Sequence, residues 1–185
     1  HQQHINPTLS KILGTRNPNG VITRPISNII KSGKKPPAIV VFVVLDQGGQ
    51  QLYDAHPDVP TNINLLKSQS AYFPNAEVGH LDAETGPGHA AIGTGSYPSA
   101  SSIIGNIKFS MEHGKLIERH VYGSKEDAVQ PEELLTETLA DVVDESNKNE
   151  SIVISQCYAS RAAIGMGGHG SYKLTEGSFQ PDKDF

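Results

Sequence analysis

The stretch AIVVFVVL at residues 38–45 is the part of the sequence that says most about the fold. All of these residues are apolar, most are β-branched, and Asp46 ends the run. A run of this length and composition predicts a central strand that is buried on both faces of a sheet. A second run, SIVIS at residues 151–155, predicts another core strand.

Helical patterns lie between these two predicted strands. Residues 131–146 place apolar side chains at helical spacing, and Glu132 and Glu133 suit the positive end of a helix dipole. Shorter helices are expected at residues 61–70 and 87–95, and a further strand at residues 71–78. The order strand, helix, strand predicts an α/β layered fold with a largely parallel central sheet flanked by helices.

The charges are distributed unevenly along the 185 residues. The first 45 residues contain six Lys and Arg residues and no Asp or Glu, although the formal net charge of the chain is −5. Residues 1–37 are rich in Pro, Asn, Gly and Lys, and we expect a flexible basic arm or linker there, with one short helix near residues 9–13. The net negative charge argues against a nucleic-acid platform. No stretch approaches the roughly 18–20 apolar residues that a membrane span needs.

The single cysteine, Cys157, excludes an internal disulfide and a cysteine-rich zinc site. Because it follows the apolar run at residues 151–155, we expect a buried and inert thiol.

Two residues carry the strongest chemical signals. Asp46 follows the predicted strand at the edge where open α/β sheets place ligands, and a divalent metal is the strongest partner for a carboxylate there. The ordinary alternative is an aspartate that caps the turn at Gly48. Thr85 precedes a predicted helix start, where free backbone N–H groups favour a phosphate. A threonine hydroxyl needs a base or a metal to become a nucleophile, and the ordinary alternative is a helix cap.

Two further residues could contact a phosphate. The amide of Asn106 could donate a hydrogen bond to a phosphate oxygen, although an asparagine in this position is often only a turn residue. Arg161 follows the second predicted strand and could bind a phosphate through two parallel hydrogen bonds. An ordinary surface ion pair is the alternative for Arg161.

Taken together, these segments resemble the nucleophile region of the alkaline phosphatase superfamily. The resemblance rests on TGPGH at residues 85–89, IGTG at 92–95, Pro98 and IGN at 104–106. It is closest to the type I phosphodiesterases/nucleotide pyrophosphatases, and the chain also resembles phosphate-irrepressible bacterial alkaline phosphatases. The segment SRAAI at residues 160–164, with Gly168 and His169, resembles a later block of the family. The resemblance covers roughly residues 38–175.

The resemblance implies a metal-dependent phosphoric ester hydrolase acting on a small phosphate ester or nucleotide. Thr85 matches a metal-bound nucleophile that forms a phospho- or nucleotidyl-threonine, and Asp46 matches a metal ligand. Asn106 and Arg161 match the groups that hold phosphate oxygens. Two zinc ions are expected in the complete enzyme, and a periplasmic or extracellular location is expected by resemblance. The remaining ligands belong to the second half of the family's domain, so residues 38–185 match its N-terminal part, and this chain alone is expected to be inactive.

Ala159 is a departure from the family pattern. The monoesterases carry a phosphate-contacting lysine two residues before the arginine, and on an extended segment Ala159 and Arg161 would share a face. Losing that cation favours a monoanionic diester substrate. The alternatives are a phosphomonoesterase of the same superfamily and a non-catalytic fragment. His89 and His169 do not match the family's metal ligands and are expected to be structural.

Overall fold

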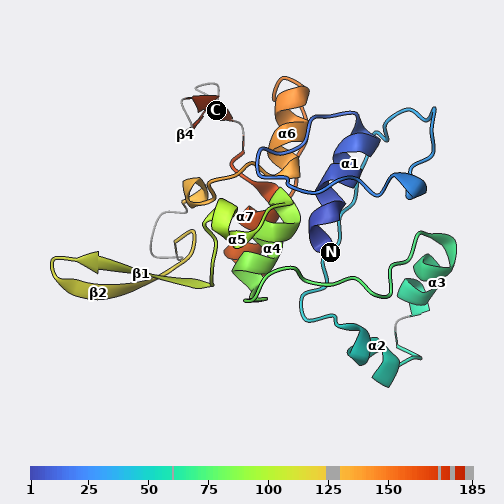
Figure 1. Ribbon diagram of the computed structural model, residues 1–185, viewed down its shortest axis with the longest axis horizontal. Helices are drawn as coiled ribbons and strands as arrows, with labels where there is room; N and C mark the ends of the chain where they lie inside the picture. Colours follow the sequence, from blue (N-terminus) through green and yellow to red (C-terminus); the bar gives the residue numbers. More distant parts are fainter. Residues whose placement is uncertain (60, 124–129, 171, 176–177, 182–185) are drawn as a thin grey trace. The chain divides into compact units, whose positions relative to one another are not determined.

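The computed structural model describes residues 1–59, 61–123, 130–170, 172–175 and 178–181. The chain divides into two compact units, which are considered separately (Figure 1). The first comprises residues 1–36 and 78–185, and the second comprises residues 37–77. In the described residues, no helix is long and apolar enough to cross a membrane.

Helices form the centre of the first unit. Helix α4 (Thr85–Thr94) contacts α5 (Pro98–Ser101), α7 (Ser160–Gly167) and α1 (Ile5–Leu13), while α6 (Leu139–Ser146) packs against α1 and α7 (Figure 1). The buried apolar core comprises Ala90, Ile103, Val121, Tyr122 and Leu134, with Ile164 of α7 packed against it. Burial, together with the nearby Glu133 carboxylate, raises the pKa of the Tyr122 phenol.

The helix expected at residues 87–95 is confirmed as α4, and its residue Ala90 belongs to this core.

Glycines bring α4 and α7 into backbone contact. A Cβ atom added at Gly93 would lie 1.9 Å from the carbonyl oxygen of Gly165. One added at Gly165 would lie 2.8 Å from the backbone nitrogen of Ala90. The two helices can pack at this separation only because neither residue has a side chain.

Helix α6 begins later than the sequence pattern predicts. The single helix expected at residues 131–146 is wrong in its first half, where a 3₁₀ turn, η3 (Pro131–Glu133), is followed by extended backbone at Leu134. The helix starts at residue 139 because Thr138 and Asp141 form a reciprocal capping box, with hydrogen bonds of 3.2 and 2.8 Å.

His169 joins the end of α7 to the start of α6. Its backbone N–H donates to Asp141 at 2.7 Å, and its Nδ1 lies 2.9 Å from the second carboxylate oxygen. Its Nε2 donates to the carbonyl of Leu134 at 2.8 Å. With its side chain 3% exposed, His169 has the structural role that we expect for it.

The N-terminal residues differ from the expected flexible arm. They include η1 (Gln2–His4), α1 and η2 (Ser27–Ile29), and they belong to the first compact unit. The buried side chain of Asn6 donates to the carbonyl of Gly93 at 2.6 Å. Arg16 binds the buried carboxylate of Glu137 through two hydrogen bonds of 2.6 Å, and this contact raises the pKa of Arg16. The arm is ordered by these partners, which lie far away in sequence. The predicted start of the catalytic domain at residue 38 stays a prediction.

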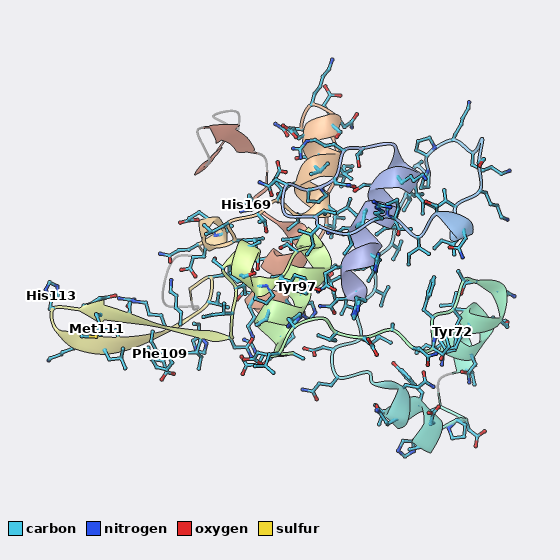
Figure 2. The ribbon with its side chains drawn as sticks, in the orientation of Figure 1. Tyr72, Tyr97, Phe109, Met111, His113 and His169 are labelled. Atoms are coloured by element: carbon cyan, nitrogen blue, oxygen red, sulfur yellow. The ribbon has the colours of Figure 1, made fainter. Side chains whose placement is uncertain are left out.

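The strands of the described residues form two antiparallel pairs. In one, β1 (Ile107–Glu112) pairs with β2 (Lys115–His120); in the other, β3 (Tyr172–Thr175) pairs with β4 (Ser178–Pro181). The outward side chains of Phe109 and Met111 lie on the first hairpin (Figure 2). This mixture of helices and small sheets is compatible with an α/β fold.

The described residues show no parallel central sheet. Residues 38–45, 71–78 and 151–155, which we expected to be strands, have no strand assignment there, and Ile39 and Ile152 are 80% and 90% exposed. A strand buried on both faces needs hydrogen-bonded neighbours, and the described part of the chain supplies none for these segments. The parallel sheet therefore stays a prediction. Cys157, expected to be buried, is exposed because the apolar run before it is not packed in a core.

In the second unit, the described residues form two helices. Helix α2 (Gln50–Ala55) follows a turn at residues 45–48, and α3 (Thr61–Gln69) confirms the helix expected at residues 61–70. The ammonium group of Lys67 lies 4.8 Å from the ring centroid of Tyr72 and 5.5 Å from that of Tyr53.

Candidate active site

Thr85 is the first residue of α4, and its side chain is half-buried. Glu84 occupies the cap position, and its carbonyl accepts the first helical hydrogen bond, from Gly88, at 2.9 Å. The carbonyl of Thr85 accepts a hydrogen bond of 2.8 Å from Nδ1 of the buried His89. This contact holds His89 against the first turn of the helix, in the structural role that we expect for it.

Asn106 lies against the same helix end. Its Oδ1 atom accepts a hydrogen bond of 2.7 Å from the backbone N–H of Gly86. Its carbonyl accepts one of 3.0 Å from Val121. Because the amide oxygen faces an N–H donor, the amide NH₂ remains as the group that can donate to a ligand. The structure thus brings Asn106 to the residue that follows Thr85.

Gly86 makes this approach possible. A Cβ atom added there would lie 3.1 Å from Oδ1 of Asn106 and 3.2 Å from the carbonyl oxygen of Gly105. Both distances are shorter than most carbon–oxygen contacts, so a side chain at residue 86 would push the turn at residues 105–106 away from the helix by a few tenths of an ångström.

Arg161 lies in the first turn of α7. Its Nε atom is buried and has no hydrogen-bond partner, and among the described residues no ion pair involves its guanidinium. The ordinary surface ion pair is therefore not what the structure shows. A buried N–H group without an acceptor is costly, and an anionic ligand would satisfy it. Within the described part of the chain, no hydrogen bond joins Arg161 to Thr85 or Asn106.

The local geometry at Ala159 differs from the expectation. Ala159 is the N-cap of α7, with φ −100° and ψ 122°, and the helix begins at Ser160. Arg161 is therefore helical, and successive helical residues turn by about 100°, so residues 159 and 161 do not share a face as they would on an extended segment.

Asp46 lies in the second unit, in the turn at residues 45–48, and its side chain is exposed. The N–H of Gly48 donates to the carbonyl of Leu45 at 2.9 Å, and Gln47 has a positive φ of 60°. Asp46 therefore does not end a strand here. Because it and Thr85 belong to different units, its role as a metal ligand stays a prediction.

Asp46 and Thr85 offer fewer ligands than a zinc ion needs. The Asp46 carboxylate and the Thr85 hydroxyl are oxygen donors that a divalent metal accepts, but zinc usually takes three or four protein ligands that include nitrogen or sulfur. No group of three or more His, Cys, Asp or Glu side chains that could hold a metal occurs among the described residues. These two donors do not make a zinc site by themselves.

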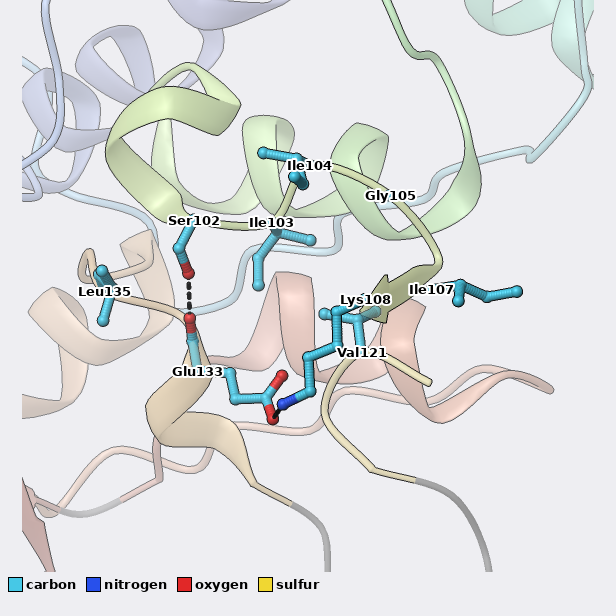
Figure 3. A pocket seen from close by; sticks show the side chains of 9 residues that line it. All are labelled: Ser102, Ile103, Ile104, Gly105, Ile107, Lys108, Val121, Glu133 and Leu135. Carbon is cyan, nitrogen blue, oxygen red and sulfur yellow. Dashed lines mark hydrogen bonds and ion pairs between the residues drawn. The ribbon is translucent and has the colours of Figure 1, made fainter. Parts of the chain in front are cut away.

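A pocket of about 280 Å³ adjoins the turn that carries Asn106 (Figure 3). Its walls are largely apolar, and Lys108 forms an ion pair with Glu133 at one side. The lining residues are Ser102, Ile103, Ile104, Gly105, Ile107, Lys108, Val121, Glu133 and Leu135. The sequence patterns did not predict this pocket, because its two walls are about 30 residues apart in the chain.

The type I phosphodiesterase/nucleotide pyrophosphatase family matches residues 40–165, and the chain belongs to this family. The match includes Asp46, Thr85, Asn106 and Arg161.

Two curated proteins are similar to the chain. Alkaline phosphatase PhoK of Sphingomonas sp. is 33% identical over 144 residues, which are 72% of this chain and 25% of that protein. Alkaline phosphatase PhoD of Zymomonas mobilis is 28% identical over 140 residues, which are 71% of this chain and 24% of that protein. The chain thus spans about a quarter of the length of these relatives. No solved structure matches it.

Proposed function

We propose that the complete protein is a phosphoric ester hydrolase in which Thr85 is the nucleophile. Oγ1 of Thr85 attacks phosphorus, and the bond from phosphorus to the leaving oxygen breaks. The products of this step are a phospho- or nucleotidyl-threonine and a free alcohol or phosphate. Water then attacks the same phosphorus atom and releases the threonine hydroxyl.

The contact between Asn106 and Gly86 is the observation that carries this proposal. The side-chain oxygen of Asn106 and the backbone N–H of Gly86 meet at the N-terminus of α4, directly beside Thr85. The amide NH₂ of Asn106 would donate to a non-bridging phosphate oxygen. The unsatisfied Nε of Arg161 supports a second phosphate contact, although its position relative to Thr85 is part of the proposal.

A divalent metal would lower the pKa of the threonine hydroxyl and stabilise the leaving oxygen. We propose two zinc ions, with Asp46 and Thr85 among their ligands and the other ligands contributed by residues outside this sequence. We further propose a periplasmic or extracellular location and a small phosphate ester or nucleotide as substrate.

Chelation is expected to abolish hydrolysis by the complete protein, and added zinc is expected to restore it. Thr85 and Asp46 supply only two oxygen donors, and a hydroxyl without an activator is a poor nucleophile. The measurement is the rate of phosphate-ester hydrolysis before dialysis against a chelator, after it, and after zinc is returned. Magnesium at the same concentration is the control for a general cation effect. Full activity in excess chelator would contradict the proposed metal dependence.

Phosphate diesters are expected to be better substrates than monoesters. A monoester carries nearly two charges and a diester one, so a site with one cation fewer is less favourable for the monoester, by about 10- to 100-fold. Alanine at position 159 supplies no cation whichever way it faces, so this expectation does not require residues 159 and 161 to share a face. The test compares kcat/KM for p-nitrophenyl phosphate and bis(p-nitrophenyl) phosphate in the complete protein. A ratio that favours the monoester would support the second candidate function, a phosphomonoesterase, which agrees with the names of the two curated relatives.

A further inference from the structure

Glu84 makes a contact that the proposed reaction does not yet use. One oxygen of its carboxylate, Oε2, accepts a hydrogen bond of 2.6 Å from the backbone N–H of Asn106. Asn106 in turn reaches back, and its side-chain oxygen accepts from Gly86 at 2.7 Å. Glu84 and Gly86 stand on either side of Thr85. These two hydrogen bonds therefore connect Asn106 to the residues on both sides of the proposed nucleophile.

Three of the polar groups of Asn106 have hydrogen-bond partners. Glu84 holds the backbone N–H, Gly86 holds Oδ1, and Val121 holds the carbonyl at 3.0 Å. The amide NH₂ is the remaining polar group, so its direction follows from the other three contacts. A donor that is already oriented does not have to reorient when charge develops on a phosphate oxygen, so it stabilises that charge without an energetic cost.

The negative charge of Glu84 does not by itself favour the binding of a phosphate ester. A carboxylate next to the site of an anionic substrate repels it, and the repulsion acts against binding. A hydrogen bond from a backbone N–H to a carboxylate is, however, stronger than one to a neutral acceptor. The hydrogen bond to Asn106 can therefore favour the reaction by more than the repulsion between the carboxylate and the substrate disfavours it.

We infer that Glu84 is a positioning residue, which acts on the reaction by holding Asn106 in its donating orientation and does not itself touch the substrate. This inference rests on the proposed function, because it takes Asn106 as the phosphate-oxygen donor.

The test is a double-mutant cycle in the complete protein with Glu84→Ala, Asn106→Ala and both together. We expect Glu84→Ala to lower kcat/KM and to weaken inhibition by inorganic phosphate, each by about tenfold. The double variant should lose no more than Asn106→Ala alone, because Glu84 acts through Asn106. Glu84→Gln keeps an oxygen acceptor without the charge and should stay within about threefold of the original protein. Thermal unfolding, measured for each variant, separates a lost orientation from a lost fold.

The possible results distinguish a wrong role for Glu84 from a wrong proposed function. Additive losses from Glu84→Ala and Asn106→Ala would overturn the inference about Glu84 and leave the proposed function standing. Tighter inhibition by phosphate in Glu84→Ala would also overturn it, because that result shows charge repulsion alone. An original protein that hydrolyses no phosphate ester, or an Asn106→Ala variant with undiminished activity, would instead count against the proposed function or its donor, and the inference would fall with it.

Discussion

Replacing Thr85 by alanine in the complete protein is expected to lower kcat/KM for phosphate esters by about 10⁴-fold or more. The alanine variant has no oxygen at the first position of α4 that could form the covalent intermediate. Because Thr85 is half-buried at the start of a helix, the loss of its hydroxyl should change stability by only about 1 kcal/mol. The measurement is steady-state kinetics on the variant together with its thermal unfolding.

Thr85→Ser is the matched control for this prediction. It keeps the hydroxyl and removes only a methyl group, so it should retain activity within about 100-fold of the original protein. An alanine variant that keeps more than about a tenth of the activity would contradict the nucleophile assignment, since removing a nucleophile costs far more than that.

Gly93→Ala is expected to destabilise the fold by about 3 kcal/mol or more. The added Cβ atom would lie 1.9 Å from the carbonyl oxygen of Gly165, and a backbone atom cannot rotate away as a side chain can. The two helices would have to separate, and the buried hydrogen bond from Asn6 to the carbonyl of Gly93 would be disturbed as well. Thermal or denaturant unfolding of the purified protein measures the loss.

Gly88→Ala is the control in the same helix. A Cβ atom added at Gly88 meets nothing within 4 Å, so this variant should be neutral or more stable by up to about 1 kcal/mol because alanine favours helix. Equal unfolding midpoints for the two variants would show that α4 and α7 do not pack as closely as described.

The helices around residues 61 and 85 could be predicted because their signals are local. A threonine before an apolar repeat, and the Gly-Pro-Gly sequence after Thr85, set the first turns without help from distant residues. The start of α6 carried an equally local signal, Thr138 with Asp141 three residues on, but the longer apolar pattern concealed it. Local signals therefore predict where a helix begins better than apolar spacing does.

The strands and the N-terminal residues could not be predicted in the same way. An apolar run such as residues 38–45 becomes a strand only when other strands pair with it, and the described residues contain no such neighbours. The expected flexibility of the first 37 residues rested on composition. It missed the contacts of Asn6 with Gly93 and of Arg16 with Glu137, which lie 87 and 121 residues apart in sequence.

The candidate site shows the same division. The motif pattern selected Thr85 and Asn106 separately, and the structure joins them through the hydrogen bond to Gly86. Glu84 was missed, although an acidic residue directly before the proposed nucleophile was visible in the sequence. Only the fold shows that its carboxylate reaches a backbone group 22 residues further on.

Trapping the covalent intermediate would show directly whether Thr85 is the nucleophile. The complete protein would be mixed with a phosphate ester that carries a radioactive phosphoryl group, quenched in acid during turnover, and digested to peptides for mass spectrometry. We expect a phosphoryl or nucleotidyl group on Thr85 and none on the Thr85→Ala variant. A label on another residue, or hydrolysis by an active protein that shows no burst and no trapped label under any quench time, would contradict it.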